Sequence, residues 1–346
     1  MSGRLPLLTL LAATALGGAA GRVNLTGHVV DTGGKPLGHA TILVYHAGVK
    51  TGYSTFCPSC YADCGRRGVT DAAGRYTIRN LSPDLLFELL VVREGYLSEL
   101  VKSVDPVKGS APDAALKPRA KVEDPGRVVR GRVVDPRGAP LRDAVVRPQG
   151  VLVNDPKRGH MAMYGTVAGL DLIAVTNQRG EFEVSYDRPA LQVLLLVEAR
   201  GFAPKLFNHI ATGIDRKTMT VTEGAVVRGR LVDHGKPVAG AEMGLVPQQR
   251  GGGAELELFG SPYYEIRIGT QPDGGFVITD VPTPVEWFLY GKMESLAAHG
   301  ATVPVKCSTM ADKKEVELGD VQVALGSAGK WFSAITSRSR MACGCT

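Results

Sequence analysis

Three cysteines in the first third of the chain, Cys57, Cys60 and Cys64, are the residues best placed to do chemistry. A Cys-x-x-Cys pair with a third cysteine and the nearby His46 could supply the four ligands of a zinc site. However, no second Cys-x-x-Cys and no paired histidines follow at zinc-site spacing, and Pro58-Ser59 gives no sign of the helix start that a redox-active pair needs. The chain has six cysteines, an even number that favours disulfides in an exported protein. We therefore expect a disulfide that staples a loop, and which two of the three cysteines form it stays open.

The motifs of the common hydrolases and nucleotide-binding enzymes are missing from the sequence. It contains no His-Glu-x-x-His zinc-peptidase signature, no Gly-x-Ser-x-Gly nucleophile elbow and no Gly-x-x-x-x-Gly-Lys-Ser/Thr phosphate loop. The seven histidines are scattered and lie in no recurrent motif. We predict a protein that is not an enzyme and that needs no metal or cofactor.

The composition indicates a fold class and argues against one class of partner. The 43 glycines and 21 prolines, with only 6% aromatic residues, are typical of short strands joined by tight turns. The net charge is +6, but the basic residues are spread along the chain and alternate with apolar ones. A nucleic-acid groove would need clustered basic residues with stacking aromatics. We therefore expect an all-β protein that does not bind nucleic acid.

The first residues are typical of a secretory signal peptide. Arg4 supplies the positive charge, residues 5–16 form the apolar run, and Gly18-Ala19-Ala20 offer small residues for cleavage. The run is too short to span a bilayer, and no later stretch is apolar enough to do so. We predict that residues 1–21 are removed and that the mature chain, with no transmembrane segment, is secreted, periplasmic or held at the cell envelope.

Two motifs recur three times in the same order. The first is Gly-x-Val/Leu-Val-Asp followed by a proline turn, and it begins at Gly27, Gly131 and Gly229. Its aspartates, Asp31, Asp135 and Asp233, could be read as calcium ligands, but bonding to the backbone of the turn explains them without a metal. The second motif places a threonine six residues before an aromatic residue, across a glycine turn, at 70–76, 176–182 and 270–276. It predicts a β-hairpin whose aromatic side chain enters the core.

A nearly continuous apolar strand follows each hairpin, at residues 86–92, 193–197 and 287–290. Such runs predict central strands that are buried on both faces or nearly so. The first two copies then have a Gly-aromatic step, Gly95-Tyr96 and Gly201-Phe202, which the third copy lacks.

Together these motifs resemble the carboxypeptidase regulatory-like domain, and the resemblance covers residues 22 to about 325. It implies a seven-stranded Greek-key β-sandwich of the transthyretin type, a fold grouped with carbohydrate-binding folds. The arrangement is similar to that of exported bacterial proteins that carry such domains in tandem. We expect a signal peptide followed by three sandwiches, a linker and a tail: 1–21 signal peptide, 22–118 first sandwich with the cysteine insertion, 119–127 linker, 128–223 second sandwich with a loop insertion, 224–325 third sandwich, and 326–346 an irregular, truncated or frame-shifted tail.

The resemblance is specific for fold and unspecific for ligand. We favour a non-catalytic structural or interaction module with an unknown protein or glycan partner. One alternative is a glycan-binding protein, since aromatic residues in the insertions could stack on sugar rings. These residues are Tyr53, Phe56, Tyr61, Tyr164, Tyr263 and Tyr264. Their competing role, which we weight more heavily, is to cover the ends of the sandwiches. The other alternative is an accessory segment of a peptidase or outer-membrane complex.

Overall fold

The chain folds into β-sandwiches, and the computed structural model describes residues 21–248, 266–296, 299–310 and 314–324. The expected tail and all but the last residue of the expected signal peptide lie outside these ranges. In the described residues the helices are short 3-10 turns, and none is long and apolar enough to cross a membrane. The predicted all-β class, with three tandem sandwiches, is confirmed.

Each sandwich consists of two sheets, and we call the sandwiches modules 1, 2 and 3. Module 1 contains β1 (Val23–Asp31), β2 (Thr41–Val49), β3 (Arg67–Val69), β4 (Arg75–Leu81), β5 (Leu85–Val92), β6 (Glu99–Val104), η1 (Pro106–Lys108) and β7 (Ala114–Leu116). Its sheets have the orders β4-β1-β7 and β3-β2-β5-β6.

Modules 2 and 3 repeat this plan with additional strands. Module 2 contains η2 (Pro125–Arg127), β8 (Val128–Val134), β9 (Val145–Asp155), β10 (Gly159–Tyr164), β11 (Ala174–Val175), β12 (Glu181–Ser185), β13 (Gln192–Glu198), β14 (Lys205–Ala211) and β15 (Gly213–Thr220). Module 3 contains β16 (Ala225–Asp233), β17 (Lys236–Pro237), β18 (Glu242–Pro247), β19 (Ile266–Gly269), β20 (Gly275–Val281), β21 (Val285–Gly291), η3 (Met293–Leu296), β22 (Ala301–Thr302), β23 (Val305–Thr309) and β24 (Glu315–Ala324). In every module the opening strand pairs antiparallel with the hairpin strand and parallel with the closing strand.

The recurring glycine and aromatic residue are cross-strand partners. Gly131 of β8 lies opposite Phe182 of β12, and the other modules pair Gly27 with Tyr76 and Gly229 with Phe276. A Cβ atom on any of these glycines would collide with the aromatic ring. The glycine therefore lets the ring lie flat over the opening strand, and the prediction that the aromatic enters the core is confirmed.

The recurring threonine has a role that the sequence did not reveal. Thr176 Oγ1 accepts a hydrogen bond of 2.8 Å from Ala144 N and donates one of 2.6 Å to Leu141 O. Thr70 and Thr270 make the same pair of bonds in their modules. Each of these three residues is only 3% exposed. The hydroxyl group thus fastens the hairpin to the start of an earlier strand of the same module, β2, β9 or β18.

Two of the three recurring aspartates support turns, as predicted. Asp31 Oδ1 accepts hydrogen bonds from the backbone N–H groups two and four residues later, and Asp135 Oδ1 does the same. Asp233 differs, because its carboxylate binds His234 Nδ1 at 2.6 Å and His299 Nδ1 at 3.1 Å. The turn explanation therefore holds for the first two copies, while the third carboxylate faces two imidazoles.

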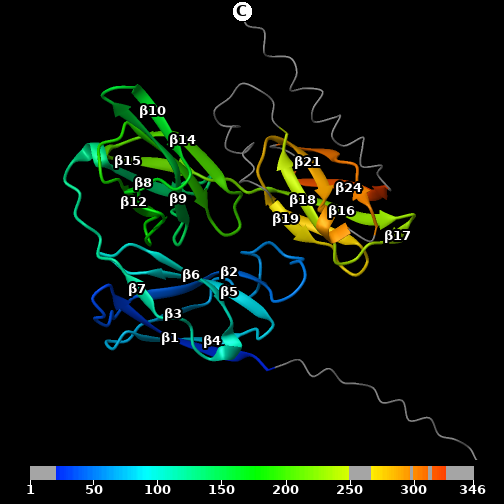
Figure 1. Cartoon of the computed structure of the whole chain (residues 1–346), viewed down its shortest axis with the longest axis horizontal. Coiled ribbons are helices and arrows are strands. Elements are labelled where there is room, and N and C mark those ends of the chain that lie inside the picture. Colours follow the sequence, from blue (N-terminus) through cyan, green and yellow to red (C-terminus); the bar gives the residue numbers. More distant parts are fainter. Residues whose placement is uncertain (1–20, 249–265, 297–298, 311–313, 325–346) are drawn as a thin grey trace, which may run out of the picture.

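The modules are not arranged in a line: modules 2 and 3 lie side by side, and module 1 lies against both (Figure 1). A small apolar cluster crosses from module 1 to module 2, and it contains Leu43, Leu90, Val145 and Ile173. Because β5 packs on its own core through one face and on module 2 through the other, it is buried on both faces from Leu89 to Val91, as predicted.

The same prediction is wrong for the third module. Along β21 the buried residues Trp287 and Leu289 alternate with the partly exposed Phe288 and Tyr290. One face of this strand meets the core, and among the described residues no second module covers the other face with an apolar cluster like that on β5.

Candidate functional site

The cysteine insertion, residues 50–66 between β2 and β3, leaves module 1 and reaches module 3. Ser54 O accepts a hydrogen bond of 2.6 Å from Gly269 N at the end of β19. Cys60 Sγ lies 3.3 Å from Thr279 Oγ1 in β20. A Cβ on Gly269 would press on the backbone of Tyr53, so a glycine permits this close contact. The insertion therefore bridges modules 1 and 3.

A disulfide joins Cys57 to Cys60 within this insertion, with their Cα atoms 5.1 Å apart. Cys64 is free and buried in the core of module 1. Its Sγ donates a hydrogen bond to Pro58 O, and burial raises the pKa of the Cys64 thiol to about 11. A neutral, enclosed thiol is a poor nucleophile and a poor metal ligand. Of the pairings left open by the sequence, the structure contains Cys57–Cys60.

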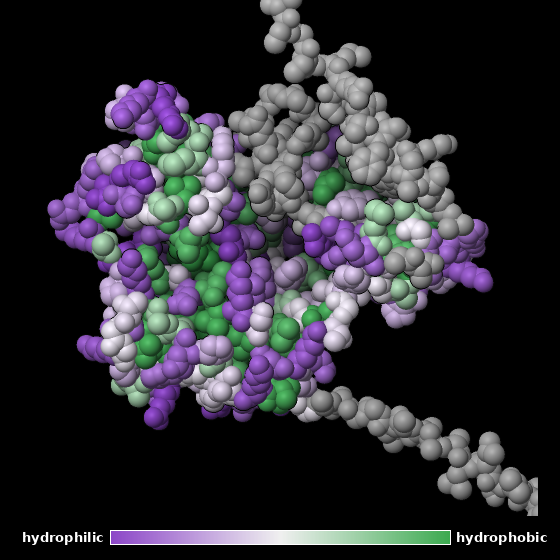
Figure 2. Space-filling view, in the orientation of Figure 1, coloured by the Kyte–Doolittle hydropathy of each residue, from purple (hydrophilic) through white to green (hydrophobic). Residues whose placement is uncertain are grey.

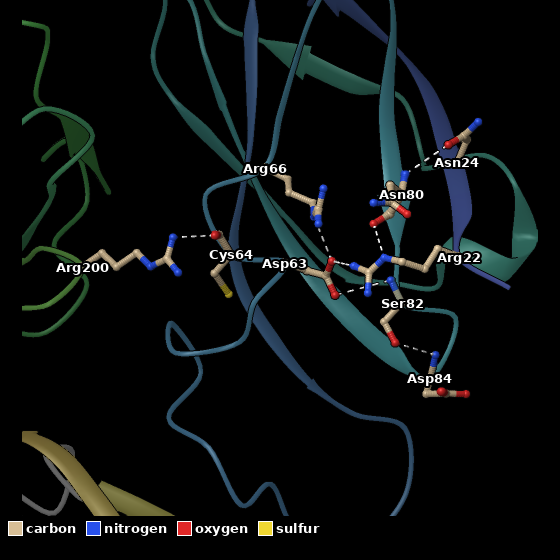
Figure 3. Close-up of polar contacts among 9 residues, drawn as sticks. All are labelled: Arg22, Asn24, Asp63, Cys64, Arg66, Asn80, Ser82, Asp84 and Arg200. Atoms are coloured by element: carbon tan, nitrogen blue, oxygen red, sulfur yellow. Dashed lines mark hydrogen bonds and ion pairs between the residues drawn. The ribbon is translucent and has the colours of Figure 1, made fainter. Parts of the chain in front are cut away.

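A buried carboxylate anchors the far end of the insertion to module 1 (Figure 3). Asp63, whose side chain is 3% exposed, pairs with the guanidinium of Arg22 and accepts a 3.0 Å hydrogen bond from Arg66 Nε. The backbone N–H of Ser82 also points at this carboxylate, at 3.4 Å. Two positive partners offset the cost of burying the charge.

Module 2 holds the same segment from the other side. Arg200 donates a 2.6 Å hydrogen bond from Nη1 to Cys64 O, and Figure 3 shows its side chain reaching across from module 2. Gly65, at φ 89°, leaves room for this guanidinium, because a Cβ there would contact it. The insertion is thus fixed by contacts with all three modules.

The three modules enclose a cavity of about 600 Å³ at their junction, and Figure 2 shows the surface hollowed there. All three modules contribute to its walls. The histidine and the charged residues of the lining are His46 and Arg67 from module 1, Arg142, Asp143, Glu198 and Arg200 from module 2, and Arg267 and Asp280 from module 3. A cavity of this size is typical of small-molecule sites, which occur preferentially where domains meet.

One wall of the cavity contains a fixed tyrosine. Tyr45 Oη lies 3.3 Å from Glu198 Oε2, and Arg147 donates a 2.7 Å hydrogen bond to the same oxygen. Burial, and then the Glu198 charge, raise the pKa of Tyr45, so its hydroxyl stays protonated and donates. The Tyr45 ring stacks on His46 at 4.0 Å, and His46 Nδ1 lies 3.0 Å from Glu88 Oε2. His46 is therefore engaged with Glu88 and lies outside the group of residues around the disulfide that could hold a metal ion.

The aromatic residues proposed to stack on sugars do not form one surface. Tyr53 and Phe56 are 37% and 55% exposed on the cysteine insertion. Tyr61 packs on the core of module 1 and meets Phe56 edge to face at 5.4 Å. Tyr164, 63% exposed, lies on β10, a strand of module 2 on the side remote from module 1 (Figure 1). Tyr263 and Tyr264 lie outside the described residues.

The insertion of module 2, expected as a loop over roughly 149–172, is in large part a β-hairpin. Strand β9 extends through it and β10 returns, with Gly159 opposite Asp155 and Tyr164 opposite Gly150. Val151 and Val153, two residues apart in β9, are both buried in the core of module 2, while Leu152 between them is only partly buried, as a strand with one face on the core requires. The insertion therefore enlarges a sheet and leaves the cavity to other segments.

No protein-family model and no curated protein sequence matches the chain. Among solved structures, a streptococcal ancillary pilin is similar at 12% identity and a TM-score of 0.25, over 87% of this chain and 99% of that one. The BcpA major pilin subunit of Bacillus cereus gives 9% identity and a TM-score of 0.22, over 88% and 100%. The Bacillus anthracis TIE protein gives 10% and 0.22, and the chain, through 87% of its length, spans about half of that protein (51%). At these TM-scores the similarities carry no inference about function.

Proposed function

We propose that this chain is an exported, non-catalytic protein of three carboxypeptidase regulatory-like modules that acts as a structural or interaction module at or outside the cell envelope. The module limits we propose are 22–118, 128–223 and 224–325. The observation that carries the proposal is that the recurring polar residues form structural hydrogen bonds. Nearly all of them bind backbone N–H or C=O groups, as the hydrogen bonds of Thr176 and Asp135 illustrate. None of the recurring residues is paired with another as nucleophile and general base.

The contacts between modules support a mechanical role. Arg67 of β3 pairs with Asp143 at 3.0 Å, and Arg119, after module 1, pairs with Asp171 at 3.0 Å. Together with the shared apolar cluster, these ion pairs join modules 1 and 2 at several separate points. A partner would therefore bind one preformed surface and not three independently moving modules.

The experiment measures turnover and unfolding of the oxidised mature chain. We expect no hydrolysis of peptide, ester or glycoside substrates and a melting temperature that a chelator does not change. In cells, the protein should fractionate with the envelope or the medium. Hydrolysis of a peptide bond by the purified chain would contradict the proposal, and so would retention of the uncleaved chain in the cytoplasm.

A second candidate, glycan binding, is favoured by one observation: Tyr53 and Phe56 are exposed on the insertion whose Cys57 and Pro58 line the cavity. Aromatic faces beside fixed polar groups are suited to sugar rings. A glycan array probed with the wild-type chain and with Tyr53→Ala/Phe56→Ala tests it. Binding that the double variant loses, while Tyr164→Ala keeps it, would establish this candidate, and an array without binding would remove it.

A further inference from the structure

Asp280 of module 3 faces the disulfide of module 1 across the junction. The Sγ atoms of Cys57 and Cys60 and a carboxylate oxygen of Asp280 all lie within 4.8 Å of one another. Within the described part of the chain, the Asp280 carboxylate has neither a hydrogen-bond donor nor a cation as a partner. The residue is only partly exposed, so its negative charge is partly shielded from water and has no positive partner or hydrogen-bond donor among the described residues.

The backbone at this position does not require a carboxylate. Asp280 has φ 57°, in the left-handed region that asparagine and aspartate tolerate best among residues with a side chain. Asn80 occupies the corresponding position of module 1, one residue before the end of the hairpin strand, at φ 63°. Because an uncharged asparagine meets the same backbone requirement in module 1, the backbone conformation does not explain the negative charge of Asp280.

Two thiolates and a carboxylate are the donors of a zinc site. Cysteine sulfur binds Zn²⁺ at about 2.3 Å and carboxylate oxygen at about 2.0–2.2 Å, which places neighbouring ligand atoms well within the span of this group. Both Cys57 and Asp280 line the junction cavity, so water can reach the fourth position of a tetrahedral ion. Cys64 and His46, the ligands suggested by sequence alone, are outside the group.

We propose that the thiol form of Cys57 and Cys60, together with Asp280, is a binding site for a zinc-class divalent cation between modules 1 and 3. The cation displaces the two thiol protons, its charge is balanced by the two thiolates, and the Asp280 carboxylate gains a cation as a direct partner. The site and the disulfide exclude each other, because oxidation removes two electrons and two protons from the thiols and consumes both sulfur ligands. The proposal is independent of the structural role proposed above, which concerns the oxidised chain.

The test uses the full mature chain reduced with a tertiary phosphine, which is oxidised to the phosphine oxide as the disulfide gains two electrons and two protons. Zn²⁺ binding is measured by competition with a chromogenic chelator, in the wild-type sequence and in a Cys343→Ser/Cys345→Ser background that removes the terminal Cys-x-Cys. We expect one ion per chain in that background, and none for the oxidised protein. Bound Zn²⁺ should also slow alkylation of Cys57 and Cys60.

Asp280→Asn is the decisive variant, because it keeps a side chain suited to the backbone and removes the anionic ligand. It should weaken Zn²⁺ binding by more than about tenfold, the effect seen when even an outer-shell partner of a metal site is lost. Asp273→Asn, seven residues away in an exposed turn where an amide can still accept the Gly275 N–H bond, should bind as the wild type does. The proposal is overturned if Asp280→Asn binds as tightly as Asp273→Asn. It is equally overturned if the Cys343→Ser/Cys345→Ser chain binds no Zn²⁺ when reduced.

Discussion

Leu90 of module 1 and Val145 of module 2 belong to one buried apolar cluster, so a residue of one sandwich contributes to a core shared with the next. Leu90 is fully buried although its neighbours Leu89 and Val91 already fill the core of module 1. The strand β5 is apolar on both faces because it serves two cores. The shared cluster makes the modules interdependent.

Leu90→Ala should therefore destabilise the junction. A leucine truncated in a packed core typically costs about 2–5 kcal/mol, and we expect a value in the lower half of this range, since the shared cluster is small. Thermal unfolding followed by circular dichroism should show module 1 separating from module 2 as an earlier transition. Leu172→Ala, at a leucine that is 70% exposed, is the matched control and should leave the transition unchanged. Equal melting of the two variants would mean that the cluster does not couple the modules.

Thr176→Val should destabilise module 2. The substitution keeps the shape but leaves the Ala144 N–H and the Leu141 carbonyl without their buried partner, at a cost of about 1–3 kcal/mol. Chemical denaturation gives the change in free energy of unfolding. Thr218→Val on the exposed face of β15 is the control, and it should change this free energy by less than about 0.5 kcal/mol. A neutral Thr176→Val would show that the hydroxyl clamp is dispensable.

Gly131→Ala should disrupt the hairpin packing in module 2. The added Cβ collides with the Phe182 ring, and overpacking of this kind costs about 1–3 kcal/mol. The double variant Gly131→Ala/Phe182→Leu should recover part of the lost stability, because leucine leaves room over the strand for the added Cβ. Gly48→Ala in β2 serves as the control, since no atom lies within 4 Å of its Cβ position. If Phe182→Leu does not rescue Gly131→Ala, the collision is not the cause.

Glu88 makes the fold sensitive to acid. The hydrogen bond with His46 Nδ1 is the main cause that lowers the pKa of Glu88 below its ordinary 4.5. The folded chain thus binds this proton more weakly than the unfolded chain does. The resulting stabilisation is complete above pH 4.5 and is lost as the pH falls through the folded value. Urea midpoints measured from pH 6 down to pH 3 should fall less steeply for Glu88→Gln. Parallel curves for the two proteins would exclude Glu88 as a contributor.

The sequence was sufficient to predict the repeated parts of the fold. The Gly131 and Phe182 motifs recur in order, and local turn chemistry with period-2 burial determines where their strands lie. Gly131 itself could be assigned to a strand, but its contact with the Phe182 ring needed the register between β8 and β12. The third module shows where sequence reasoning fails. An apolar run like that at Trp287 does not reveal whether one or both faces of the strand are buried, since burial of the second face depends on a neighbouring module.

The candidate site was largely beyond sequence reasoning. Cys57 and Cys60 carry a recognisable spacing, and a disulfide among the three cysteines was expected. Asp280 and Arg200 have no such signal, because each acts across a boundary between modules and lies more than a hundred residues from the cysteine insertion. The one local hint at Asp280 is its alignment with Asn80 of module 1, where a charge replaces an amide.

The central claim is that three separately cored sandwiches form one body around a shared cavity. Small-angle X-ray scattering of the oxidised mature chain tests it most directly, because a triangle of modules and a linear string differ in their distance distributions. We predict a distribution with a single main maximum that agrees with the arrangement in Figure 1. A distribution with a second maximum at the spacing of modules strung in a line would contradict it.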